Sequence, residues 1–170
     1  MKDKKTRALL PGSYDPITCG HLAVIEEAAH RFDEVTVAVF INPQKKGLFG
    51  YADRLELIRL ATAHLSNVSV DFSDGMVADY AKTGGYTVIL KGIRNERDRA
   101  YEEDMAAYNL EHSGIPTVLY KTPDALAEIS STAVRTALYT GEALAGLVPD
   151  AIIPAMEALY KKIAPPPCGF

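Results

Sequence analysis

The segment from Gly12 to His21, with the sequence Gly-Ser-Tyr-Asp-Pro-Ile-Thr-Cys-Gly-His, has the residue types of a phosphate-binding turn. An apolar run from Ala8 to Leu10 precedes it and apolar residues at helical spacing follow it, so the turn is expected to join a buried strand to a helix. A glycine lets the backbone approach a ligand closely, and the first amides of a helix are unpaired and attract anions. In the first turn of that helix, His21 can donate a hydrogen bond to the same anion. The pattern predicts a nucleotide triphosphate site.

A bare Thr-x-Gly-His would also fit an ordinary loop-to-helix junction, with Thr18 as a cap and His21 at the surface. Neither the Walker glycine pattern nor the dinucleotide-binding pattern G-x-G-x-x-G occurs in the sequence. The prediction of phosphate chemistry therefore depends on the whole Gly12–His21 segment and on the polar segments that converge with it.

Three further polar segments follow predicted strands. Asn42 to Lys46 comes after the second strand, Lys91 to Arg94 after the fourth, and Ile129 to Thr132 after the fifth. Two cations bracket Gly92, and the Ser-Ser-Thr run can cap a second helix while presenting further amides and hydroxyls. Ligands of parallel α/β sheets bind outside the carboxyl ends of the strands, so these segments are expected to form one site.

The elements that must position these residues alternate between apolar strands and helical patterns. Continuous runs of Val, Ile and Leu indicate a parallel sheet covered on both faces. We predict an α/β fold with a Rossmann-like doubly wound sheet of five parallel strands in the order 3-2-1-4-5, forming a single domain over 1–163 with a Pro-rich tail at 164–170. The expected strands are 7–10, 35–41, 68–72, 87–90 and 117–120, and the expected helices are 20–31, 52–65, 76–82, 99–112, 131–139 and 150–163.

Composition narrows the class of protein. The 170 residues are 48% hydrophobic and 24% charged, which suits one globular domain with a sizeable core. A formal net charge of −4 argues against a nucleic-acid or membrane-surface binder. With no signal peptide or membrane span in the sequence, we expect a cytoplasmic protein. The two cysteines, Cys19 and Cys168, suggest neither a disulfide framework nor a cysteine metal site.

Taken together, the Gly12–His21 segment, Lys45, Lys91-Gly92-Ile93-Arg94, Tyr101-Glu102 and Ile129-Ser130-Ser131-Thr132 resemble the bacterial phosphopantetheine adenylyltransferase family, part of the nucleotidyltransferase superfamily with the Thr-x-Gly-His motif. The resemblance covers nearly the whole chain. It implies transfer of the adenylyl group from ATP to 4'-phosphopantetheine, giving dephospho-coenzyme A and pyrophosphate with Mg²⁺ bound mainly through the ATP phosphates and no metal ligands from the protein. It also implies a homohexamer and feedback binding of coenzyme A.

Carried over position by position, the resemblance assigns roles to individual residues. His21, Lys45, Lys91 and Arg94 would be catalytic, with Ser13, Lys45, Val77 and Lys91 binding the phosphopantetheine. The residues expected to bind ATP are Ser13, Tyr14, His21, Gly92, Ile93, Arg94, Glu102, Ala127, Glu128, Ile129, Ser130, Ser131, Thr132 and Ala133.

The sequence departs from the usual family pattern at Cys19, at Arg99-Ala100 and at Leu126-Ala127-Glu128, the last beside the expected adenine pocket. Two alternatives remain open. A nicotinamide mononucleotide adenylyltransferase or a cytidylyltransferase would share Thr-x-Gly-His but differ around Lys91 to Glu102. A non-catalytic module that senses ATP or coenzyme A could use the same loops without turnover.

Overall fold

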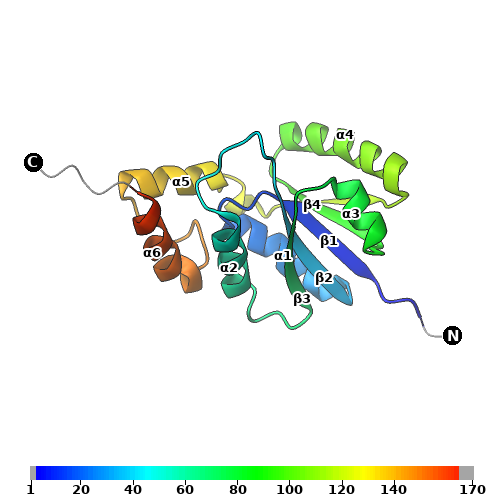
Figure 1. Ribbon diagram of the computed structural model, residues 1–170, viewed down its shortest axis with the longest axis horizontal. Helices are drawn as coiled ribbons and strands as arrows, with labels where there is room; N and C mark the ends of the chain where they lie inside the picture. The colour runs from blue at the N-terminus through cyan, green and yellow to red at the C-terminus, as the bar shows by residue number, and fades with distance from the viewer. Residues whose placement is uncertain (1–2, 165–170) are drawn as a thin grey trace, which may run out of the picture.

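The chain forms one parallel sheet flanked by helices in the computed structural model, which describes residues 3–164 (Figure 1). The predicted tail therefore lies outside the described residues, apart from Ala164. The strands are β1 (Arg7–Gly12), β2 (Glu34–Phe40), β3 (Val68–Ser73), β4 (Val88–Ile93) and β5 (Thr117–Lys121). Their order is β3-β2-β1-β4-β5 and every pairing is parallel, which confirms the predicted topology.

Alternate residues of the sheet pack on two separate cores. Ala8 and Leu10 of β1 face a large cluster that includes Ile25 of α1 (Cys19–Arg31) and Ile58 of α2 (Tyr51–Ala61). Leu9, on the opposite face, belongs to a smaller cluster with Ala81 of α3 (Val77–Thr83). The sheet is thus covered on both faces, as its continuous apolar strands predict.

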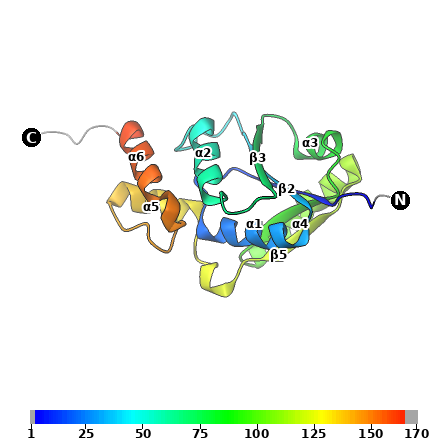
Figure 2. The same ribbon diagram turned by 90° about the horizontal axis from the view of Figure 1, so that it is seen from below.

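The remaining helices are α4 (Glu96–Ser113), which contacts α3, and α5 (Ser131–Thr140) and α6 (Ile153–Ile163). Both views show α5 and α6 at the end of the molecule opposite the N-terminus, which is the carboxyl end of β1 (Figures 1 and 2). No helix within residues 3–164 is long and apolar enough to cross a membrane.

Several element boundaries differ from the predicted ones. The predicted strand 87–90 continues as β4 to Ile93, because its ladder with β5 extends through Lys91 and Gly92. The predicted helix 99–112 begins at Glu96, because Asn95 caps it by accepting a hydrogen bond from the Asp98 amide at 2.9 Å. Lys91, expected directly after a strand, therefore lies within one.

Two helices are shorter than predicted. The helix predicted over 52–65 ends at Ala61, where the Thr62 hydroxyl donates to the Ile58 carbonyl at 2.8 Å. The helix predicted over 150–163 is α-helical only from Ile153 and follows a 3₁₀ turn, Asp150–Ile152. Its first turn contains Pro154, which has no amide to donate and is tolerated there.

Candidate active site

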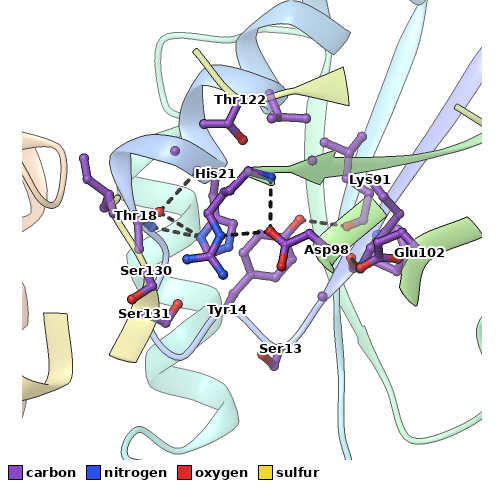
Figure 3. Close-up of a pocket in the computed structure, with 18 of the residues that line it drawn as sticks. Ser13, Tyr14, Thr18, His21, Lys91, Asp98, Glu102, Thr122, Ser130 and Ser131 are labelled. Carbon is purple, nitrogen blue, oxygen red and sulfur yellow. Dashed lines mark hydrogen bonds and ion pairs between the residues drawn. The ribbon is translucent and has the colours of Figure 1, made fainter. Parts of the chain in front are cut away.

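A cavity of about 390 Å³ opens at the carboxyl edge of β1 and β4, where three of the four predicted polar segments converge (Figure 3). The fourth, Asn42 to Lys46, does not line it. It is lined by the β1–α1 turn, the end of β4, one side of α4 and the start of α5. The predicted site residues that line it are Ser13, Tyr14, His21, Lys91, Gly92, Arg94, Glu102, Ile129, Ser130, Ser131 and Thr132.

Hydrogen bonds at the start of α1 fix the tautomer of His21. The amide of Thr18 donates to His21 Nδ1 at 3.0 Å, while the Thr18 hydroxyl accepts from the His21 amide at 3.3 Å. Because Nδ1 accepts a backbone hydrogen bond, it carries no proton, and the neutral ring bears its hydrogen on Nε2. Burial, followed by the positive charges of Lys91 and Arg94, lowers the pKa of His21 to about 4. His21 is therefore a neutral donor at physiological pH.

The turn that precedes α1 is held in a tight conformation. Tyr14 has a φ of 44°, in the left-handed region that non-glycine residues rarely occupy, and its hydroxyl donates to the Leu10 carbonyl at 3.1 Å. Its ring meets that of His21 edge-on, with 5.0 Å between the centroids. From α5, Arg135 donates to the Asp15 carbonyl at 2.7 Å and Ser131 to the Pro16 carbonyl at 2.8 Å. The turn is thereby fixed to a helix over one hundred residues away in sequence.

Lys91 of β4 and Arg94, the residue directly after β4, are both paired with carboxylates of α4. Lys91 Nζ lies 3.4 Å from Glu102 Oε1 and donates to the Pro11 carbonyl at 3.2 Å. Arg94 donates to Asp98 Oδ2 from its amide and from Nε, both at 3.1 Å. Figure 3 shows Lys91 and Glu102 on the side of the cavity away from Thr18, with Asp98 between them and His21. α4 thus restrains the positive groups before any ligand binds.

The start of α5 brings a second helix N-terminus to the cavity. The Ser130 hydroxyl caps the helix by accepting from the Ala133 amide at 3.0 Å. Ser131 and Thr132 line the cavity beside it. Two helix N-termini and three cations, Lys91, Arg94 and Arg135, therefore face one space, an arrangement that suits a polyphosphate.

A second cavity of about 210 Å³ adjoins the first, and the two share Pro11, Gly12, Ser13, Lys91 and Glu102. Apart from this shared edge its lining is largely apolar, and it includes Val77, one of the residues expected from the resemblance to bind the acceptor. Its other lining residues are Phe40, Tyr101, Met105, Ala106, Asn109 and Thr117.

The remaining predicted site residues line neither cavity. Lys45 lies on the exposed loop between β2 and α2, and the Ile93 side chain is buried at 2% exposure. Ala127, Glu128 and Ala133 flank the cavity in sequence without lining it. Ile93 is the last residue of β4, which is longer than predicted, and its side chain packs in the interior of the protein.

Sequence reasoning missed several lining residues: Thr18 as a partner of His21, and Val24, Asp98, Thr122, Arg135, Asn109 and Thr117. Two of these had a local signal: Thr18 precedes a helix as a cap residue, and Asn95-x-x-Asp98 is typical of a helix start that brings the carboxylate back toward Arg94. The others are brought to the cavities by tertiary packing.

Comparisons with known proteins agree with this geometry. Residues 9–137 match the family described as Cytidylyltransferase-like. The chain is 43% identical over 160 residues to a phosphopantetheine adenylyltransferase of Symbiobacterium thermophilum, a match that covers 94% of this chain and 99% of the relative. It is 41% identical over 155 residues to the protein of the same name from Corynebacterium efficiens, covering 91% and 98%.

A solved structure, that of a putative nicotinate-nucleotide adenylyltransferase from Vibrio parahaemolyticus, matches with a TM-score of 0.64 at 20% identity, over 93% of this chain and 99% of that one. At this identity the likeness supports the fold alone. The family match over more than half of the chain and the identity to curated relatives establish more: this chain belongs to the phosphopantetheine adenylyltransferase family of cytidylyltransferase-like nucleotidyltransferases.

Proposed function

We propose that this protein transfers the adenylyl group of ATP reversibly to 4'-phosphopantetheine, giving dephospho-coenzyme A and pyrophosphate. The observation that carries the proposal is the pair of adjoining cavities with Lys91 on their shared edge. One cavity has the groups to bind a polyphosphate, the other suits an amphipathic arm, and the reacting phosphates would meet between them. Family membership supports the same reaction.

The polar cavity would hold ATP. Its triphosphate would lie against the N-termini of α1 and α5, with Arg94 and His21 as further donors. The Ile129–Thr132 segment would contact the nucleotide, and Glu102, which is paired with Lys91, would either stay on that cation or turn to the nucleotide.

The apolar cavity would hold the pantetheine arm. Val77 and Met105 offer apolar contact, whereas the arm's amides need hydrogen-bond partners. Two buried polar groups are available there. Asn109 is 7% exposed, and the Thr117 hydroxyl is buried without a hydrogen-bond partner among the described residues. A ligand with amides would satisfy such groups.

The chemistry needs no protein nucleophile. A phosphate oxygen of the acceptor, ionised at neutral pH, attacks the α-phosphorus of ATP, and the bond to the β-phosphate bridging oxygen breaks to release pyrophosphate. The protein must bring two anions together, align them and stabilise the charge that develops. Alignment of this kind supplies about 7–11 kcal/mol in favourable cases. Lys91 and the Nε2 hydrogen of His21 would act on the transferring group.

Magnesium fits this site as an ion carried by ATP. Within residues 3–164 no group of three or more His, Cys, Asp or Glu side chains is placed to hold a metal, and Asp98 and Glu102 are each paired with a cation. Mg²⁺ commonly keeps several waters and binds through substrate phosphates. When bound, it neutralises charge on the triphosphate. The homohexamer and feedback binding of coenzyme A stay predictions from the resemblance, and the cytoplasmic location stays a prediction from the sequence.

The test is product analysis by mass spectrometry after incubation with Mg²⁺, ATP and either 4'-phosphopantetheine or nicotinamide mononucleotide. Dephospho-coenzyme A and pyrophosphate should form with the first acceptor and scarcely any dinucleotide with the second. Pantetheine without its phosphate should be inert, because it lacks the ionised nucleophile. A nicotinamide dinucleotide without dephospho-coenzyme A, or ATP binding with no product from any acceptor, would overturn the proposal.

A further inference from the structure

A buried ion pair lies behind the β1–α1 turn and lines neither cavity. Arg54 Nε, from α2, is 3.4 Å from Asp15 Oδ1, and the two residues are 7% and 6% exposed. Burying two charges is costly, and apolar residues of the same volume are often as stabilising. We therefore expect the two residues to serve by positioning the segments that they contact.

The pair joins the β1–α1 turn to the loop between β2 and α2. The Asp15 carboxylate accepts from the amides of Leu48 and Phe49 at 2.8 and 2.9 Å. Arg54 donates to the Phe49 carbonyl at 2.8 Å and to the Ser13 carbonyl at 3.1 Å. Both charged groups thus contact both segments. Such hydrogen bonds to ionised groups are stronger than neutral ones.

The loop is seated directly on this pair at Gly47. A Cβ atom added there would lie 1.9 Å from Arg54 Nη2 and 2.7 Å from Asp15 Oδ2, which neither neighbour can tolerate without moving. Two residues earlier, Lys45 is held in a turn by its amide, which donates to the Asn42 carbonyl at 3.0 Å. The ion pair therefore fixes the position of this loop and of Lys45 on it.

We propose that Asp15 and Arg54 are positioning residues that, through Gly47, hold the β2–α2 loop where Lys45 meets the acceptor phosphate. This inference rests on the proposed function. It explains why the side chains of the pair contact Ser13, on the shared edge of the two cavities, and the loop that carries Lys45, whereas α5 contacts only the backbone carbonyl of Asp15. The pair would thus affect the affinity for the acceptor, whereas the affinity for ATP would depend on the N-termini of α1 and α5.

The sharpest test replaces Gly47 with Ala and leaves every charge in place. Gly50→Ala is the matched control on the same loop, because a Cβ there meets nothing within 4 Å. Isothermal titration should show 4'-phosphopantetheine binding weakened at least about tenfold by Gly47→Ala, as for loss of a contact to a charged group. ATP binding should change less than about twofold. Equal acceptor affinities of the two variants would overturn the inference.

Combining Gly47→Ala with Lys45→Ala shows whether the effect passes through the ammonium group. If it does, the two losses in acceptor affinity should not add, whereas independent effects would add. Full additivity would contradict the proposal. Arg54→Lys keeps the positive charge and Arg54→Met removes it. When the two variants have the same thermal stability, Arg54→Lys should bind 4'-phosphopantetheine more tightly than Arg54→Met. A purely structural role of Arg54 would not produce this difference. A wild-type protein that binds ATP but not 4'-phosphopantetheine refutes the proposed function itself, which these variants do not test.

Discussion

The two cavities that share Lys91 are built in different ways. The polar cavity is formed by backbone and by short polar side chains at the starts of α1 and α5, and its donors are fixed by hydrogen bonds such as that from the Thr18 amide to His21. The apolar cavity is formed by side chains of α3, α4 and the strands, including Val77 and Met105. The first is preorganised for charge, whereas the second offers surface and a few buried polar groups.

This difference indicates a division of labour. Donors fixed in the empty protein cost little to reorganise as charge develops during transfer, so they should contribute mainly to rate. Apolar surface and isolated hydrogen bonds act on bound ground states as much as on transition states, so they should contribute mainly to affinity. Substitutions in each cavity can separate the two contributions.

The largest effect is expected at His21. Replacing it with Ala removes the preorganised Nε2 donor, so turnover should fall by about 100-fold or more while the KM for ATP changes little. Steady-state kinetics with both substrates varied measures this split. Turnover near that of the wild type would show that His21 has no part in the mechanism. It would also contradict the inference that the polar cavity contributes mainly to the rate.

Lys91, on the edge shared by both cavities, should affect both substrates. Lys91→Ala should lower kcat/KM for ATP and for 4'-phosphopantetheine by about 10- to 100-fold each, as for loss of a charged hydrogen-bond partner. Lys91→Arg keeps the charge and should retain more activity, although its forked shape differs. Kinetics of the two variants side by side provides the check, and a defect confined to one substrate would contradict the shared edge.

A smaller effect, confined to the acceptor, is expected at Asn109. Asn109→Leu keeps the branched shape of this buried side chain and its number of heavy atoms and removes its amide, so the KM for 4'-phosphopantetheine should rise by about two- to tenfold with turnover and the ATP KM unchanged. Leu110→Ala, at an exposed neighbouring position, is the control. A comparable rise in the ATP KM would show that the cavities do not act separately.

The same difference explains how much was predictable from sequence. The fold and the polar cavity follow from local signals: continuous apolar strands, and turn and cap residues such as Thr18 and Ser130 placed at strand ends. The apolar cavity has no such signal, because Met105 and Asn109 repeat at ordinary helical spacing.

Two other features could not be predicted from the sequence. The Asp15–Arg54 pair joins residues 39 positions apart and is visible only after folding. The extent of β4 was missed because charged Lys91 and flexible Gly92 have low intrinsic strand preference, which the β5 ladder overrides.

The smallest effect is expected from pH, and it tests whether the polar cavity is preorganised without substrate. Since the pKa of His21 is lowered to about 4, ¹⁵N spectra of the free protein should show Nε2 protonated and Nδ1 unprotonated, without change from pH 8 to pH 5.5. In the unfolded chain the ring takes up a proton below about 6.5, whereas the folded protein does not until about pH 4. The folded state should therefore lose stability as the pH falls through this window, by a margin that His21→Gln removes. That variant also assigns the His21 signals. A midpoint near 6.5, or a proton on Nδ1, would show that the donor is not fixed in advance and that substrate binding must organise the polar cavity as well.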